Sequence, residues 1–450
     1  MERLPLELLE ICVEASLYVG FEIRPLPDTS ATATGPERLQ TKKWATYARS
    51  SYVDLCNIRR TNRRLHAASH RAFGRMLSDR IFRLTKFGLD DLEQIGSDDA
   101  LRMHVRTITF GTSTFTPYLF TKDRLSNGGA WKERLQEALF GASTSWYRRF
   151  QLKRTLSQCY DWQSKTTKTD LNQRLAILLG NFPNLDSVRI RYEDGMDWND
   201  DHRLLVKFPN EYRAFQVALA EKRRHDRFDP SPHVHTKPSI VAAALRDANV
   251  CVKDLRLDNF FMNDGYSLPH IVDQHPPFTN LRVLRISIYI DLTRTQRDRL
   301  GDTQALLKLI RSAPLLEDVG LTMSFAIGDY DGIRAKSSSI LSALSTRPLM
   351  RLALDGQWHF TEVDLLNLWQ TQYQTLESVV FDRIFLCEGS FTSALNTVKA
   401  QPFDKLRYLE IKRAVTYGPG MRIYMNLGTD LSVDFTGLPY RVVLDALPVS

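Results

Sequence analysis

Two groups of side chains in this sequence have the types and spacing for chemistry. The first is the segment HDRFDPSPHVH, residues 225–235, whose histidines and aspartates could ligate a metal ion. Its prolines and its place in a long polar stretch favour a solvated loop, so we expect no metal site there. The chain also contains no phosphate-binding glycine loop, nucleophile elbow or zinc-protease motif. The sequence therefore predicts a protein without catalytic residues, metal or other cofactor.

The second group is a set of arginines at equivalent positions of a recurring pattern. Arg189, Arg256 and Arg285 each lie between the last two apolar residues of their copy. In a strand such a residue faces away from its apolar neighbours, and adjacent strands lie about 4.8 Å apart. Guanidinium groups so spaced can bind carboxylate or phosphate groups of an extended peptide, which makes these the candidate target-binding residues. The alternative is that they pair with the chain's own aspartates, such as those between residues 194 and 200.

The recurring pattern is an apolar residue, two variable residues, an apolar residue, one variable residue and an apolar residue. Its copies are LDSVRI, LRVLRI, LEDVGL, LMRLAL, LESVVF and LRYLEI, with weaker copies VRTITF and VKDLRL. The middle apolar residues of the last six copies are Leu255, Leu284, Val319, Leu352, Val379 and Leu409. The steps between them are 29, 35, 33, 27 and 30 residues, which matches one strand, one helix and two connections.

The segments between these copies have the apolar spacing of helices. They are residues 170–183, 302–314, 337–348, 361–374 and 391–402. Most end at a proline, and Thr361 is a suitable N-cap. Strand–helix alternation predicts parallel strands joined by right-handed crossovers. So regular a step favours a curved solenoid, with an ordinary open α/β sheet as the alternative.

This array resembles leucine-rich repeats over roughly residues 100–415. It departs from the family in several respects, the first being that the asparagine expected three residues beyond the third apolar position is absent. Those positions hold Phe260, Tyr289, Gln357 and Ile384. The repeats also vary in length, and a long insertion with little strand character occupies about residues 191–250.

The N-terminal stretch LPLELLEICVEASLY predicts an amphipathic helix. Pro5 suits its first turn, where a missing N–H costs nothing. One apolar face follows at helical spacing, widened by Leu9, Val13 and Leu17. Its residues are Leu8, Ile11, Cys12 and Ala15. We expect Cys12, and Cys56 of the next helix, to be core residues.

Residues 51–76 predict a second helix, rich in arginine. Its apolar stripe runs through Leu55, Ile58, Leu65, Ala72 and Met76. The four arginines between residues 59 and 64 lie off this stripe, which predicts a solvated face. Contacts to a phosphate backbone are the alternative, but aromatic residues for base stacking are sparse and the acidic GLDDLEQIGSDD follows. We therefore expect no nucleic-acid partner.

At these residues the chain resembles an F-box. LPLELLEIC matches the family's Leu-Pro-x-Glu-Leu-Leu-x-x-Ile opening, and DLCNIRRTNRRLHAAS matches its closing helix. An F-box ahead of leucine-rich repeats is a layout familiar among fungal F-box proteins. The resemblance implies that both helices bind a Skp-type adaptor through apolar side chains. These candidate adaptor-binding residues are Leu4, Pro5, Leu8, Leu9, Ile11, Leu55, Ile58 and Leu65. The chain departs from the family in its polar insertion at about residues 19–50, which we expect to be a flexible loop.

Composition indicates the compartment. The 450 residues are 43% hydrophobic and carry a formal net charge of +8, which permits acidic partners without demanding nucleic acid. The five cysteines are far apart and form no CxxC pair, which favours a reducing compartment. We expect no signal peptide and no membrane-spanning stretch. These features predict a cytoplasmic or nuclear protein that has no membrane partner.

Together the patterns predict an α/β protein with two domains. Residues 1–77 would form a small all-α F-box-like module, and residues 78–450 an irregular leucine-rich-repeat solenoid with parallel strands and outer helices. The resemblance implies a non-catalytic substrate-recognition subunit of a Skp–cullin–F-box ubiquitin ligase. Such a subunit would bind the adaptor, and through it a cullin, at one end and a target protein on the repeats. The alternative is a repeat scaffold without ligase attachment, whose N-terminal helices only cap the array.

Overall fold

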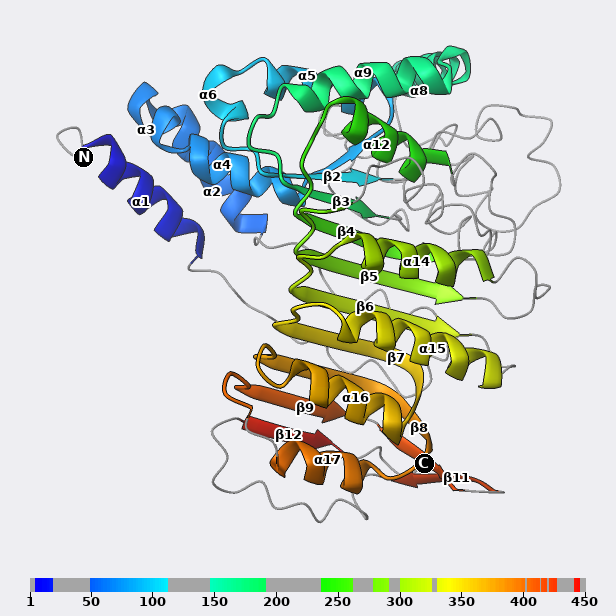
Figure 1. The fold of residues 1–450 in the computed structure, drawn as a ribbon. Coiled ribbons are helices and arrows are strands. Elements are labelled where there is room, and N and C mark those ends of the chain that lie inside the picture. The colour runs from blue at the N-terminus through cyan, green and yellow to red at the C-terminus, as the bar shows by residue number, and fades with distance from the viewer. Residues whose placement is uncertain are drawn as a thin grey trace. The chain divides into compact units, whose positions relative to one another are not determined.

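A computed structural model describes most of the chain (Figure 1). The described residues are 5–18, 49–111, 146–191, 236–261, 278–290, 300–325, 330–400, 403–412, 414–418, 421–426 and 441–445. They belong to two compact units, residues 1–251 and 252–450. The boundary predicted between residues 77 and 78 lies inside the first unit. Leu4, and most of the two predicted insertions, lie outside the described residues.

The first unit begins with helices that pack around one apolar core. They are α1 (Leu6–Tyr18), α2 (Arg49–Thr61), α3 (Arg63–Ala68) and α4 (His70–Met76). The prediction of one continuous arginine-rich helix was wrong, because the chain breaks at Asn62 and at Ser69. Asn62 is extended, with φ of −161°, and its side chain accepts the backbone N–H of Leu65 at 2.8 Å. It therefore caps a new helix, as asparagine commonly does.

A short parallel sheet follows in the same unit. Its strands are β1 (Ile81–Arg83), β2 (Thr107–Gly111) and β3 (Ser187–Arg191). Their register aligns Ile81 with Thr109 and Thr109 with Arg189. The connecting helices are α5 (Lys86–Gly96), α6 (Asp99–Arg102), α8 (Trp146–Lys165) and α9 (Lys168–Gly180). The turn of 3-10 helix η2 (Leu77–Asp79) precedes β1.

Helix α12 (Thr236–Asp247) lies within the predicted insertion at residues 191–250. It packs against α9, and the Asn172 side-chain amide donates to the Asp247 carboxylate at 2.6 Å. Its residues from Ile240 to Leu245 are all buried. The C-terminal part of this insertion is therefore a helix of the first unit.

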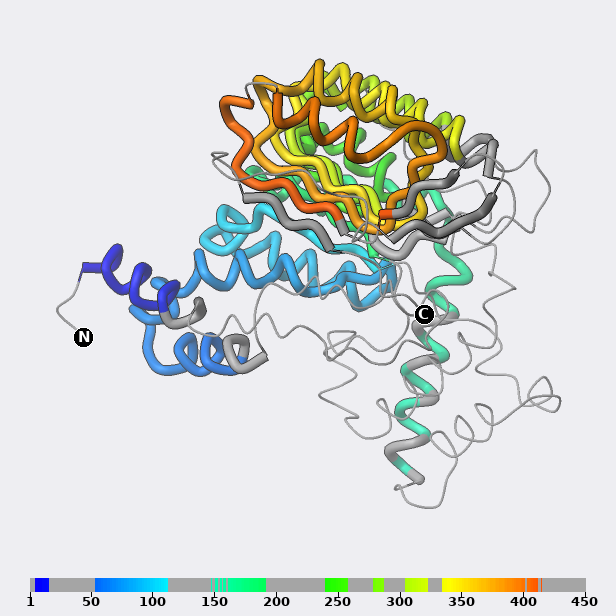
Figure 2. The backbone as a smooth tube through the Cα atoms, turned by 90° about the horizontal axis from the view of Figure 1, so that it is seen from below, coloured from blue at the N-terminus to red at the C-terminus, as the bar shows by residue number. Residues whose placement is uncertain are grey.

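The second unit alternates strands and helices as the sequence predicted. Its elements are β4 (Asp254–Phe261), β5 (Val283–Ile290), α14 (Leu300–Ser312), β6 (Asp318–Phe325), α15 (Tyr330–Ser345), β7 (Arg351–Thr361), α16 (Glu362–Gln372), β8 (Ser378–Glu388), α17 (Phe391–Ala400) and β9 (Tyr408–Lys412). Neighbouring strands pair in parallel, so the mixed α/β class and the parallel sheet are confirmed. Figure 2 shows the helices of these repeats in one layer over one face of the strands.

The core of the second unit lies between this face of the sheet and the helices. In each strand the apolar residues of the pattern are buried, as with Leu352 and Leu354, whereas Ala353 between them is partly exposed. Thr361 caps α16 as predicted: it accepts the backbone N–H of Asp364, whose carboxylate accepts from Thr361. Among the described residues, no helix combines the length and apolarity that crossing a membrane requires.

The sheet ends in strands that the repeat pattern did not predict. Beyond β9, the strand β10 (Val415–Gly418) continues beside β8 in parallel. Strand β11 (Met421–Asn426) then pairs antiparallel with β10, and β12 (Arg441–Asp445) pairs parallel with β9.

A β-bulge interrupts the pairing of β7 with β8. Between Asp355 and Trp358 the register shifts by one residue. Gly356 has a φ of 108°, and Arg383 of β8 has a φ of 59°. A positive φ is easy for glycine but strained for arginine. The Arg383 guanidinium donates to the Asp355 carboxylate, Nη2 to Oδ1, at 2.7 Å, which helps to hold this conformation.

Candidate protein-interaction surfaces

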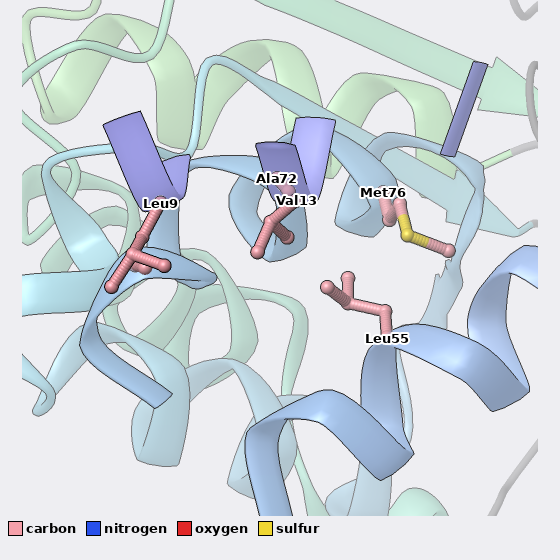
Figure 3. Close-up of a cluster of buried hydrophobic side chains, with 6 residues drawn as sticks. Leu9, Val13, Leu55, Ala72 and Met76 are labelled. Carbon is pink, nitrogen blue, oxygen red and sulfur yellow. The ribbon is translucent and has the colours of Figure 1, made fainter. Parts of the chain in front are cut away.

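The predicted adaptor-binding residues divide between a core and a surface. The buried residues of the N-terminal core are Leu9, Val13, Leu55, Ala68, Ala72 and Met76 (Figure 3). The two side chains of α1 point toward those of α2 and α4 in this view. Ile58 and Leu65 pack against the same core and are partly buried. Leu9 and Leu55 therefore hold the helices together instead of facing a partner.

An ion-pair cluster fixes the rotation of α1 on this core. The Glu14 carboxylate lies 3.0 Å from Nε of Arg71 and 3.4 Å from Nη1 of Arg75, both on α4. Glu14 follows Val13 in the chain, about 100° further around the helix, and is partly buried beside α4. Apolar packing and charge pairing thus select one side of α1 for the core.

The opposite side of α1 is apolar and exposed. We call Leu8, Ile11, Cys12 and Ala15 the α1 outer face; all four are exposed, Leu8 by 47% and Ile11 by 60%. They stand at positions i, i+3, i+4 and i+7, which form one stripe along a helix. On α2, Val53 and Cys56 are also exposed. The expectation that Cys12 and Cys56 are core residues was wrong, because Leu9, Val13 and Leu55 take the inward positions.

Arg59 is not part of a solvated face, contrary to the prediction. Its Nη1 donates to the Ser69 hydroxyl at 3.1 Å, and Nη2 lies 3.0 Å from Nε2 of His66. The guanidinium also stacks on the Phe73 ring, 4.4 Å from its centroid. Burial lowers the pKa of Arg59, with partial compensation from the charge of Asp98. The other three arginines of this run, Arg60, Arg63 and Arg64, are exposed as expected.

Two of the predicted target-binding arginines, Arg256 and Arg285, form ion pairs with aspartates. Each aspartate lies on the same face of the sheet, two residues nearer the start of the strands. Arg256 forms a bidentate ion pair with Asp254 on its own strand. Its Nε and Nη2 donate to the carboxylate at N–O distances between 2.8 and 3.1 Å. Arg285 donates through Nη2 to Asp318 on the neighbouring strand β6. The register places Arg256 directly beside Arg285. The sequence signal for these partners was the aspartate of VKDLRL and LEDVGL, because residues two apart in a strand share a face.

Arg189 belongs to the first unit. Its Nη1 lies 3.7 Å from the buried Asp79 carboxylate, at the end of η2. The Thr109 hydroxyl, on the adjacent strand, donates to the Ser78 carbonyl at 2.5 Å. The aspartates between residues 194 and 200, proposed as its alternative partners, lie outside the described residues. The structure thus brings Arg256 and Arg285 together and places Arg189 in a different compact unit.

One cysteine–histidine pair has the composition of a catalytic dyad. Cys387 Sγ lies 3.6 Å from Nδ1 of His359, on the neighbouring strand. Burial lowers the pKa of His359 to about 4. So weak a base is poorly suited to remove a proton from the Cys387 thiol, as a nucleophilic dyad would require. Within the described ranges no three histidine, cysteine or acidic side chains cluster as metal ligands.

The buried imidazole predicts acid sensitivity of the second unit. Because the folded state keeps His359 neutral, the unfolded chain binds a proton between its ordinary pKa of 6.5 and about 4, and the folded chain does not. The contribution of the neutral His359 to the free energy of unfolding is therefore fully present above pH 6.5. About 3 kcal/mol of it is lost as the pH drops to 4. Urea unfolding at pH 7 and pH 5 measures this, with His359→Asn as the variant that removes the titration. An equal acid-induced loss in variant and wild type would contradict the assignment.

Within the part of the chain that the structure describes, the α1 outer face and the arginine-bearing face of the second unit's sheet are two surfaces suited to binding other proteins. No protein-family model matches this chain, and no curated protein matches it, so these two surfaces are the ground for a functional assignment.

Proposed function

We propose that this protein is a substrate-recognition subunit of a Skp–cullin–F-box ubiquitin ligase. The α1 outer face would bind the Skp-type adaptor, and the strand–helix array, as an irregular leucine-rich-repeat solenoid, would bind the target. The protein itself would catalyse no step. It would hold the target near the ubiquitin-loaded conjugating enzyme and so raise the local concentration of target lysines.

One observation supports the adaptor contact most strongly, namely the exposed apolar stripe on a helix that is firmly docked on its other side. Leu9 and Val13 are almost completely buried, whereas Leu8 and Ile11 are about half exposed. Exposed leucine and isoleucine in a contiguous stripe typically mark a protein-binding surface. Val53 of α2 is a further exposed apolar side chain of the same helical module.

Among the candidate adaptor-binding residues, this arrangement favours Pro5, Leu8 and Ile11 as direct contacts. Leu9, Leu55, Ile58 and Leu65 would support the surface from behind through the shared core. The distinction matters for mutagenesis. Changes in the first group should affect binding alone, whereas changes in the second should also unfold the helices.

The decisive experiment is affinity purification of the full-length protein from its own cells, followed by identification of the bound proteins. We expect a Skp-type adaptor and a cullin to co-purify in stoichiometric amounts. If neither does, the alternative of a repeat scaffold without ligase attachment stands, with α1–α4 acting only as a cap at one end of the array.

A further inference from the structure

The second unit carries two arginines that share one carboxylate. Asp318, at the start of β6, pairs through Oδ1 with Nη2 of Arg285 on β5. Its other oxygen, Oδ2, lies 3.8 Å from Nη1 of Arg351 on β7. Two guanidinium groups thus face one carboxylate, which leaves one positive charge in excess at this point of the sheet.

The neighbouring arginines on the sheet are neutralised individually. Arg256 has Asp254, and Arg383 has Asp355, each at hydrogen-bonding distance. The excess charge of these ion pairs therefore lies at Arg285 and Arg351, and the acidic residues Asp382 and Glu410 stand farther along the sheet, on β8 and β9. The Asp318 carboxylate is only 15% exposed, whereas the Arg351 side chain is 61% exposed and accessible to a ligand.

Gly320 shapes the surface next to this charge. A Cβ at this position would lie 2.6 Å from both Cδ and Nη1 of Arg285. The Arg285 side chain therefore lies flat across β6, directly over Gly320. Only a residue without a side chain leaves room for this path.

The register adds a small apolar floor beside the arginines. Gly320 aligns with Ala353 of β7, and Ala353 aligns with Val380 of β8. Because the Arg285 side chain covers Gly320, the open floor consists of Ala353 and Val380 on adjacent strands, about 4.8 Å apart. Its side chains are short enough for an extended polypeptide to approach the sheet.

We infer that Arg285 and Arg351 form an anion-binding site for an acidic or phosphorylated side chain of an extended protein segment, which lies across Ala353 and Val380 beside the Arg285 side chain. The identification of that segment as part of a ubiquitylation target rests on the proposed function. A nucleic acid fits less well, because a phosphate backbone needs a track of several cations and this site has one excess charge.

The test is fluorescence anisotropy with the full-length protein and labelled peptides on a glycine–serine linker. The probes are tetraglutamate, tetraphosphoserine and tetraalanine, together with an oligothymidylate. We expect both acidic peptides to bind more tightly than tetraalanine. A preference for tetraphosphoserine would identify a modified segment, and equal affinity an acidic one. No preference for either over tetraalanine would overturn the site, and tighter binding of oligothymidylate would overturn the protein ligand.

Three substitutions make the test specific. Arg351→Gln removes the excess charge and leaves the Arg285–Asp318 pair, so it should weaken acidic-peptide binding about tenfold. Asp318→Asn raises the excess charge and should tighten binding. The control is Arg282→Gln, which makes the same change in net charge at the exposed pair of Arg282 with Glu317. The inference would be refuted if Arg351→Gln and the control lowered the affinity for the acidic peptides equally. It would also be refuted if the Asp318→Asn variant bound these peptides more weakly than the wild type.

The two proposals can fail separately. Adaptor co-purification is measured on the same preparation as peptide binding. Adaptor binding without peptide binding would refute the anion site and leave the ligase assignment. Peptide binding without co-purification of an adaptor would refute the ligase assignment and leave the anion site.

Discussion

Replacing Leu8 with aspartate should abolish co-purification of the Skp-type adaptor. Leu8 is 47% exposed and contributes nothing to the N-terminal core, so the variant should fold normally. In a complex, the new carboxylate would be buried against the apolar surface of the partner without a counter-charge. Central apolar contacts of this kind are worth about 2–4 kcal/mol, which corresponds to a loss of about 30-fold to several hundred-fold in affinity.

The matched control for this prediction is Val363→Asp. Val363 is 63% exposed on α16 of the second unit and receives the same new charge. It should leave the adaptor complex intact. Ile11→Asp should behave as Leu8→Asp does, because Ile11 is on the same stripe. If the adaptor remains bound to both α1 variants, α1 is a cap and the ligase assignment fails.

The second large effect concerns two glycines at which the same substitution should have opposite results. Gly88 lies in the first turn of α5, and a Cβ there would be 2.2 Å from the carbonyl oxygen of Arg83. Because this oxygen is a backbone atom at the end of β1, the clash can be relieved only if the strand itself moves. We expect Gly88→Ala to lower the free energy of unfolding of the first unit by about 2–3 kcal/mol.

Gly180, the last residue of α9, is the control. A Cβ there meets no atom within 4 Å. Alanine is a better helix former than glycine by up to about 1 kcal/mol, so Gly180→Ala should stabilise the same unit slightly. Chemical denaturation of both variants measures the two effects. If Gly88→Ala raised the free energy of unfolding as Gly180→Ala does, helix propensity, and not the contact with Arg83, would govern the result.

The strands of the second unit were predictable because their surroundings force a simple pattern. One face of each strand packs on helices, and the residues there must be apolar at every second position, as Leu352 and Leu354 are. Strand β1 gave no such signal. It has three residues, and all of them, including Arg83, are buried, so alternation cannot be seen.

The rotation of α1 was not predictable from its sequence. Apolar residues occur on more than one side of this helix, so the amphipathic pattern does not select the inward face. The choice depends on shape at the contact with α2 and α4, and on the pairing of Glu14 with Arg71 and Arg75. The sequence therefore identified Leu8, Leu9 and Ile11 as one group, and packing divides them into core and surface.

The partners of the arginines were predictable only in part. Asp254 is two residues before Arg256, and a strand places both on one face. Asp318 is distant in sequence from Arg285, and its position beside that residue follows from the strand register. Register in a parallel sheet depends on the lengths of the connections, which vary here. A shared carboxylate such as Asp318 is therefore a property of the fold and not of a local motif.

The way in which the sheet ends bears on solubility at high concentration. A long parallel edge strand exposes a row of unpaired backbone groups that can recruit another chain and start aggregation. Here β8 has 11 residues, but the strands beyond it form two shorter borders, β12 with 5 residues and the antiparallel β11 with 6. Neither border is long enough to template an incoming strand of full length. Within the described residues, this end of the sheet therefore presents short strand edges to another copy.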